Sequence, residues 1–273
     1  MINFSKLWNK SGKQYHEYAL NFPQYKKTNE KLVEIAEIKA DQIVVDLACG
    51  TGLTTKAVLQ NCPDVEKIYA VDFSEDMINV AKEFVQSKKV AFIATDAQDL
   101  DKFISEKVDV VLCNSAFWQF QNKNKVLNAI SSVLKENGKF VFNLNQQFFD
   151  FGKLEPNQKI LIDTIFSEMR KRGHEPSNKI KPKIEKEKIE ELFSHAGYTL
   201  EKTETINIGP RKLDDFFNFF KIPATATFFE NVPEEDQEQI LSSVYENLNN
   251  QFTQIENNKW IYFMFKKIPS NND

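Results

Sequence analysis

The segment Ile43–Gly52 constrains the fold of this chain more than any other part of the sequence. It begins with apolar, β-branched residues that predict a buried parallel strand, and the strand closes on Asp46. The turn that follows contains the small residues Ala48, Gly50 and Gly52, and a predicted helix comes next. Small residues let the main chain turn tightly and approach a ligand without side chains in the way. The combination predicts a cradle for a nucleotide-like group.

Strands and helices alternate along the chain after this segment. The further predicted strands are Lys67–Val71, Val90–Thr95, Val108–Cys113, Lys139–Leu144, Thr199–Ile208 and Trp260–Lys266. The predicted helices between the first five strands are Thr54–Gln60, Glu75–Ser87 and Lys123–Lys135. This alternation predicts a Rossmann-like, doubly wound α/β fold with a mostly parallel, seven-stranded sheet. Ligands of such folds bind at the carboxyl ends of the strands.

Polar residues close the next three strands at this same edge. Asp72 ends the second strand, where a carboxylate can hold a ribose diol by accepting two hydroxyl hydrogen bonds. Asp96 follows the third strand and Asn114 ends the fourth. We therefore expect these side chains to lie together around the predicted cradle.

Taken in order, these motifs resemble those of the class I S-adenosylmethionine-dependent methyltransferases. The matching segments are Asp46–Gly52, Val71–Asp72, Asp96–Ala97, and Asp109–Asn114 with the later turn at Glu136–Gly138. The resemblance covers roughly residues 40–145, and Ala48 stands where many members have glycine. The ordered set is specific, whereas each motif alone is weak.

The resemblance implies S-adenosylmethionine as the cofactor and assigns each motif to a part of it. Asp46 and the turn Ala48–Gly52 would face the amino-acid part, and Asp72 would hold the ribose. The other cofactor residues it implies are Phe73 and Met77 beside the adenine, Asp96 and Ala97 at the adenine edge, and Asn114.

A nicotinamide-binding domain is the main alternative with the same fold. It needs glycines spaced G-x-G-x-x-G, but Thr55 stands where the third small residue would be. The Gly-Thr-Gly turn after an aspartate also suits a zwitterionic methionine tail better than a pyrophosphate. The sequence thus favours the methyltransferase.

The chain is interpreted as a single methyltransferase domain over residues 1–273, with the cofactor-binding core at 40–145 and the last strand at 259–268. Residues 1–38 predict an N-terminal cover with a helix over Thr28–Ile38. Residues 146–183 and 209–258 are predicted to be lid insertions. The second of them is too long for a connecting loop. Helices are predicted in and between them over Pro156–Arg172, Lys186–Ala196, Asp214–Phe220 and Glu234–Asn249.

The N-terminal cover and the second insertion are expected to close together over the carboxyl ends of the strands and form an apolar substrate chamber. Two interpretations of Tyr15 and Tyr18 stay open, since in related methyltransferases such tyrosines reach the cofactor carboxylate, but they also pack a cover onto its sheet. The lid phenylalanines either line the chamber or, for most of them, attach the lid to the sheet. The predicted substrate residues are Tyr25, Trp118, Gln119 and Phe149.

Methyl transfer asks little of acid–base residues, since placing the nucleophile and excluding water contribute most. A base is needed only for a protonated nucleophile, and histidine is the natural choice. His16 is the one histidine expected near the site, and no catalytic residue is assigned beyond this candidate.

Composition excludes several classes of protein. The net charge of −4 gives no general attraction to nucleic acid. No apolar run approaches the length of a membrane span, and the three cysteines lack metal-ligand spacing, so neither membrane insertion nor a metal is expected. We expect a cytoplasmic protein that is a monomer or homodimer.

The predicted function is methyl transfer from S-adenosylmethionine to a small, partly apolar molecule through an oxygen, nitrogen or carbon acceptor, which includes a carboxylate or acyl group. The segment Asn114–Phe120 resembles the segment after the fourth strand in trans-aconitate, malonyl-carrier-protein and quinone methyltransferases. The alternative is a non-catalytic protein that binds the cofactor as a sensor or as the partner of another enzyme.

Overall fold

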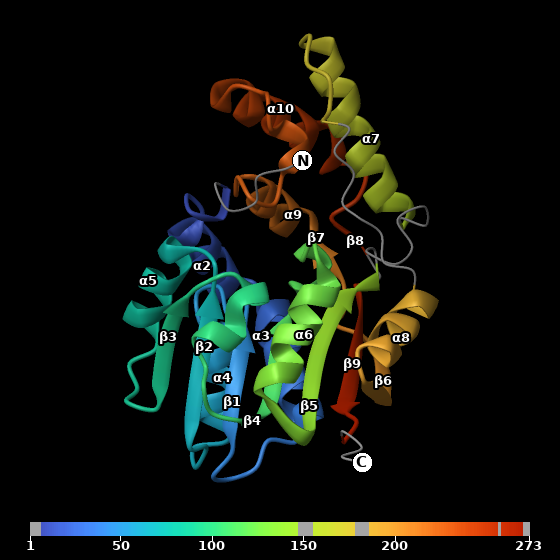
Figure 1. Cartoon of the computed structure of the whole chain (residues 1–273). Helices are drawn as coiled ribbons and strands as arrows, with labels where there is room; N and C mark the ends of the chain where they lie inside the picture. The colour runs from blue at the N-terminus through green and yellow to red at the C-terminus, as the bar shows by residue number, and fades with distance from the viewer. Residues whose placement is uncertain (1–6, 147–154, 178–185, 256–257, 270–273) are drawn as a thin grey trace.

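The computed structural model describes residues 7–146, 155–177, 186–255 and 258–269 (Figure 1). Its main sheet has seven strands in the order β3-β2-β1-β4-β5-β9-β6. The strands are β1 (Ile43–Leu47), β2 (Lys67–Asp72), β3 (Val90–Ala94), β4 (Val108–Asn114), β5 (Leu134–Asn145), β6 (Tyr198–Asn207) and β9 (Lys259–Lys267). All neighbours are parallel except β9, which runs antiparallel between β5 and β6. The predicted fold class is confirmed.

Helices cover both faces of this sheet. The helices of the core are α3 (Pro23–Ala36), α4 (Leu53–Asn61), α5 (Glu75–Phe84), α6 (Lys123–Val133) and α8 (Lys186–His195), with short 3₁₀ turns η1 (Ala97–Lys102) and η2 (Phe117–Gln119). Successive β1 residues point to opposite faces, so Val44 packs with α3 and α4 while Val45 packs with the side of α6. Strand alternation thus explains how one apolar run supports two layers.

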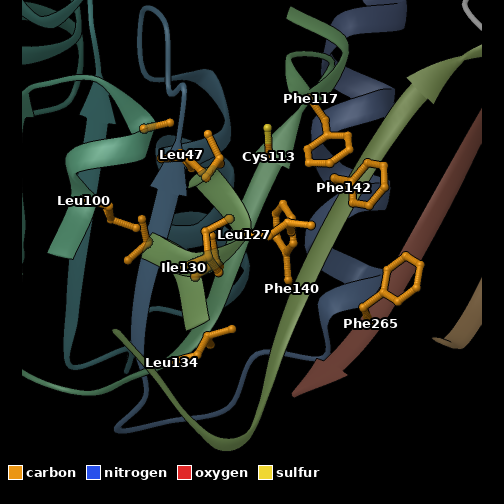
Figure 2. Packing of buried hydrophobic residues seen from close by; sticks show 14 of the residues in the cluster. Leu47, Leu100, Cys113, Phe117, Leu127, Ile130, Leu134, Phe140, Phe142 and Phe265 are labelled. Atoms are coloured by element: carbon orange, nitrogen blue, oxygen red, sulfur yellow. The ribbon is translucent and has the colours of Figure 1, made fainter. Parts of the chain in front are cut away.

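An aromatic cluster fills the face under α6 and α8. Phe140 and Phe142 of β5 and Phe265 of β9 stand side by side, and Phe117 reaches them from the segment after β4 (Figure 2). The Phe193 ring of α8 stacks on Phe265 at 3.9 Å between centroids. This cluster packs β9 and α8, at the antiparallel side of the sheet, against β5 and the segment after β4.

The described part of the N-terminal cover contains a helix that the sequence did not predict. Helix α2 (Gly12–Asn21) precedes α3, and Pro23 occupies the first turn of α3, where proline is tolerated. The main-chain N–H of Gly12 donates to Asp76 Oδ2 of α5 at 2.8 Å. A Cβ on residue 12 would lie 2.5 Å from that oxygen, so the helix start depends on glycine and on a tertiary partner. No local sequence pattern predicts this helix.

The lid is built from α7 (Pro156–Lys171), α9 (Leu213–Phe220), η4 (Thr227–Phe229) and α10 (Glu234–Leu248). A two-stranded sheet of β7 (Arg211–Lys212) and β8 (Gln254–Ile255), which the sequence did not predict, closes its base. These elements lie over the carboxyl end of β5 (Figure 1).

The lid phenylalanines correct an expectation from the sequence. Most of them do not attach the lid to the sheet. Instead Phe216, Phe217, Phe220 and Phe229 pack with α7 and α10 in a separate apolar core, which we call the lid core; its other members include Leu161, Ile165, Met169, Ile240, Leu241, Val244 and Leu248. The two predicted insertions therefore share one core, because α7 from the first packs against α10 from the second.

Within the described residues, no helix is long and apolar enough to span a bilayer. In the same residues no group of three or more histidine, cysteine, aspartate or glutamate side chains is arranged to hold a metal ion.

Candidate cofactor and substrate site

The turn after β1 adopts the backbone conformation that its small residues allow. Ala48, Gly50 and Gly52 have φ angles of 57°, 54° and 85°, in the left-handed region that disfavours larger side chains. The turn is fixed to β2 by the Cys49 N–H, which donates to the Val71 carbonyl at 2.9 Å. The predicted turn of small residues lies at the carboxyl edge of the sheet, and its role in holding a cofactor stays a prediction.

The two glycines of the turn are needed for different reasons. A Cβ on Gly52 would lie 2.9 Å from Val85 Cγ2 and 3.3 Å from Ala81 Cβ, so Gly52 allows α5 to pack against the turn. A Cβ on Gly50 would meet only Tyr15 Cε1, at 4.0 Å. Gly50 thus leaves the space between the turn and α2 open.

Asp46 ends its buried strand with an unsatisfied oxygen. Its Oδ2 accepts a hydrogen bond from Thr55 Oγ1 at 2.6 Å, whereas Oδ1 is buried and has no partner among the described residues. Burial raises the pKa of this carboxyl to about 7. The hydroxyl of Thr51 in the turn is also buried without a partner there. Such groups cost free energy unless a ligand satisfies them, so the cradle fits a ligand with polar groups at this point.

Asp72 braces the cradle from the end of β2. Its Oδ2 accepts the Gly50 N–H at 2.9 Å and its Oδ1 accepts the Ser74 N–H at 2.9 Å. Burial raises its pKa to about 6, although these main-chain donors oppose the shift. Each carboxylate oxygen has capacity for a second donor, so the contacts leave room for two ribose hydroxyls.

The residues assigned to the adenine differ in how they lie. Phe73 is half-buried and Asp96 is exposed, where its side chain caps the Gln98 N–H at 3.0 Å. Ala97 and Met77 are buried, and the Met77 side chain is only 2% exposed. Phe73 and Asp96 therefore reach the surface at the carboxyl edge of the sheet, whereas Met77 is buried.

Asn29 is a polar junction that the sequence analysis missed. Its Oδ1 accepts hydrogen bonds from Asn114 Nδ2 at 2.7 Å and Thr54 Oγ1 at 2.5 Å, and its Nδ2 donates to the Tyr25 carbonyl at 2.6 Å. It thereby fixes α3 to the start of α4 and the end of β4. The available signal was an asparagine one turn before the apolar pair Leu32 and Val33.

Three tyrosines stand beside the cradle. Tyr15 contacts Tyr25 edge-to-face at 5.8 Å between centroids, and Tyr25 contacts Tyr18 in the same way at 5.9 Å. Burial raises the pKa of Tyr15 to about 12 and raises the pKa values of Tyr18 and Tyr25 as well. All three phenols are therefore neutral near pH 7 and act as hydrogen-bonding groups rather than as bases.

Arg211 at the base of the lid is a second residue that the sequence analysis missed. Its Nη2 donates to the Tyr18 hydroxyl at 2.8 Å, and its guanidinium lies over the Phe216 ring at 3.7 Å. Close by, Gln24 Nε2 donates to the Pro210 carbonyl at 2.9 Å. The N-terminal cover and the lid thus meet in the structure, and α2 also contacts α9.

The remaining candidates lie apart from the tyrosines. Trp118 is buried in the sheet core with its Nε1 donating to the Ser115 carbonyl at 2.9 Å, and Gln119 accepts the Trp8 Nε1–H at 3.0 Å. His16 packs edge-on against Phe84 of α5 at 4.5 Å between centroids. Burial lowers its pKa, and its Nδ1 has no partner among the described residues. Phe149 lies outside the described residues.

Comparison with known proteins agrees with this geometry. The profile of the methyltransferase domain family matches residues 45–142. Malonyl-[acyl-carrier protein] O-methyltransferase 2 of Coxiella burnetii is 32% identical over 103 residues, which are 38% of this chain and 41% of that protein. Demethylmenaquinone methyltransferase of Leptospira interrogans is 35% identical over 102 residues, or 36% of this chain and 41% of that protein.

The matched segment spans only about two fifths of these two relatives. The crystal structure of the YcgJ protein from Bacillus subtilis superposes with a TM-score of 0.58 at 20% identity, over 89% of this chain and 99% of that one. The shared fold is Rossmann-like, and the segment 45–142, which carries the cradle, matches the methyltransferase domain family. In this match and in its relatives, the chain resembles the class I S-adenosylmethionine-dependent methyltransferases.

Proposed function

We propose that this protein transfers a methyl group from S-adenosylmethionine to a small, partly apolar acceptor. The observation that carries the proposal is the cradle itself, in which Gly50 leaves open space while Asp46 Oδ1 and Thr51 Oγ1 have no partner among the described residues. Unsatisfied buried polar atoms around an open backbone turn call for a polar ligand. The family match identifies the class of that ligand.

The cofactor roles follow from position. Asp46 and the turn Ala48–Gly52 receive the amino-acid part, and Asp72 receives the ribose hydroxyls with its remaining acceptor capacity. In this proposal Phe73 stacks on the adenine and Asp96 contacts its edge, and neither side chain is fully buried. Met77 and Ala97, which are buried, complete the adenine side of the site. When bound, the cofactor supplies an electrophilic methyl group.

The chain's own contribution is placement and exclusion of water. Tyr15, Tyr18 and Tyr25 cover the cradle from the N-terminal side, and Asn29 fixes Tyr25 and Asn114 above the end of β4. The phenols are neutral, so they orient an acceptor through hydrogen bonds and apolar contact. No general base is assigned, because burial lowers the pKa of His16, which makes it a weaker base, and its ring packs against Phe84.

The class of acceptor is inferred from the relatives, whose names specify a malonyl group on an acyl carrier protein and a demethylated menaquinone. Both combine a polar reacting group with an apolar body or carrier. A small molecule or acyl group of this kind is the proposed substrate; a cytoplasmic location remains a prediction.

Calorimetry with S-adenosylmethionine, S-adenosylhomocysteine and NAD tests the first part of the proposal. We expect binding of the two adenosyl ligands and none of NAD; binding of NAD alone would refute the assignment. Transfer of labelled methyl groups to a panel of acids, phenols, amines and acyl carriers tests the second part. Tight cofactor binding without transfer to any member would favour the sensor alternative.

A further inference from the structure

The Arg211 side chain is a half-buried cation beside three aromatic rings. Its guanidinium carbon lies 3.7 Å from the centroid of the Phe216 ring, 4.8 Å from that of Phe219 and 5.1 Å from that of Phe22. These rings come from both the lid and the N-terminal cover. Aromatic faces stabilise a guanidinium by cation–π attraction, but they cannot accept its in-plane N–H groups.

The hydrogen-bonding needs of Arg211 are incompletely met. Nη2 donates to the Tyr18 hydroxyl at 2.8 Å and weakly to the Asp215 carbonyl at 3.4 Å. Nε is buried and has no partner among the described residues. A buried N–H on a charged group that bonds to nothing is costly, so this position calls for an acceptor from outside the chain.

Within the described part of the chain, no carboxylate forms an ion pair with Arg211. The nearby Asp215 carboxylate instead accepts the Lys212 N–H at 3.3 Å. A cavity of about 330 Å³ lies between α2 and α9, and its lining includes Tyr18, Phe22 and Asp215, all of which touch Arg211. Among the described residues, the guanidinium therefore has an unused donor and no hydrogen-bonded carboxylate, and it adjoins residues that line the cavity; the Asp215 carboxylate acts on it only through its charge.

Arg211 is connected to the cradle by the tyrosines. The chain of contacts runs from Arg211 to Tyr18, then to Tyr25 and Tyr15, and Tyr15 faces Gly50. Arg211 and Gly50 thus stand at opposite ends of this row of contacts, so a group bound at Arg211 is separated from the turn by the tyrosines.

We propose that Arg211 binds a carboxylate of the acceptor, so that the substrates of this protein are acids with an apolar body whose carboxylate is held rather than methylated. The proposal rests on the methyltransferase function proposed above. The planar guanidinium edge matches a carboxylate, and Nε supplies the donor that the chain leaves unused. The aromatic rings accommodate the apolar part of the acid.

The test uses 4-phenylbutyrate and its uncharged amide, 4-phenylbutyramide, titrated by calorimetry into the full chain with and without S-adenosylhomocysteine. We expect the acid to bind about tenfold or more tightly than the amide, since a charge-assisted hydrogen bond is lost in the amide. Arg211→Gln should abolish this preference, and Arg211→Lys should retain only part of it. Equal binding of acid and amide, or an unchanged preference in R211Q, would overturn the proposal.

A merely structural clamp is distinguished by Gln24→Ala, which removes the hydrogen bond from the cover to the Pro210 carbonyl beside Arg211 but keeps the Arg211 charge. This variant should keep the preference for the acid, and its loss would assign Arg211 to closing the cover instead. Circular dichroism verifies that each variant is folded. Because the acid is also titrated without the cofactor product, failure of S-adenosylhomocysteine to bind would refute the methyltransferase proposal while leaving the Arg211 result readable.

Discussion

Different interactions stabilise the cradle and the lid. In the cradle, main-chain N–H groups and buried carboxyls set the geometry: Asp72 accepts from Gly50 and Ser74, and Asp46 accepts from Thr55. In the lid, helices from two separate insertions are joined by apolar side chains, among them Phe217 of α9. We therefore expect a polar ligand to depend on the hydrogen-bonded turn, and side chains of the lid to vary without altering that turn.

The same contrast distinguishes the part of the chain that matches the family profile from the part that lies outside it. The family profile ends at residue 142, before either lid insertion. The hydrogen bonds of the cradle permit few residue types, because φ angles and donor positions are fixed there. The lid core requires only apolar volume at its positions. We therefore expect mutations to divide into those that affect cofactor binding and those that affect only the lid.

The largest effect is expected from Phe229→Ala in the lid core. Removing a phenylalanine that is 2% exposed should destabilise the lid by about 3–5 kcal/mol, through lost burial and the cavity that remains. Hydrogen exchange should then accelerate in α7 and α10, while the Kd for S-adenosylhomocysteine changes less than about twofold. Phe103→Ala is the control, since this ring is 54% exposed. Loss of cofactor binding in Phe229→Ala would show that the two regions are not independent.

Gly52→Ala should reduce stability and cofactor affinity together. The residue has a φ of 85°, and its new Cβ would lie 2.9 Å from Val85 Cγ2, so strain and overpacking combine to cost roughly 2–4 kcal/mol. Gly197→Ala is a matched control, because its φ is 81° but nothing lies within 4 Å of the added atom. It should cost only the strain, about 1–2 kcal/mol. Urea unfolding measures both; equal losses would remove the packing argument for Gly52.

Asp72→Asn should weaken binding of S-adenosylhomocysteine by about 1–3 kcal/mol, because the ribose loses a charged acceptor. The control is Asp109→Asn, whose carboxylate accepts the Ile43 N–H at the opposite end of β1. That change should alter stability but not the Kd measured by calorimetry. An unchanged Kd in Asp72→Asn would mean that the ribose is held elsewhere.

The smallest effect is a dependence on pH with opposite signs for stability and binding. Burial raises the pKa of Asp46 to about 7 and of Asp72 to about 6, from an ordinary value of 3.8. Their contribution to the stability of the ligand-free protein is therefore fully present below pH 3.8 and is lost as pH rises through 6 to 7. Binding should instead weaken on acidification, since protonated Asp72 is a poorer ribose acceptor.

Urea midpoints and Kd values between pH 5 and pH 7.5 provide the measurement, a window that includes both raised pKa values. Asp72→Asn should flatten the binding profile near pH 6 relative to the unmodified protein. A profile identical in both would assign the pH dependence to another group.

Most of the sheet could be predicted from the sequence, because each core strand carries its own apolar run. The strand β1 was expected from its β-branched residues and the turn from Gly50 and Gly52. Helix α5 was expected to reach Ser87 but ends at Phe84, where Val85 turns to an extended conformation. No local sequence pattern predicts this helix end, because it depends on the packing of Val85 against Gly52.

The long-range parts could not be predicted. Helix α2 starts where the Gly12 N–H donates to Asp76 of α5. The role of Asn29 as a polar junction depends on its hydrogen bonds with Thr54 and Asn114. The strands β7 and β8 are two residues each, too short for any periodicity to reveal. All of these depend on partners that are distant in sequence.

By itself, the sequence determined the α/β architecture, the glycine turn after β1 and the acidic residues that follow the strands, because these are encoded by local periodicity and by backbone requirements at single positions. Only the tertiary structure decided that the lid phenylalanines form a core with α7 and that Arg211 meets Tyr18 across the cover. The physical reason is that burial and pairing of a side chain depend on which surfaces meet, and that is fixed when the whole chain packs.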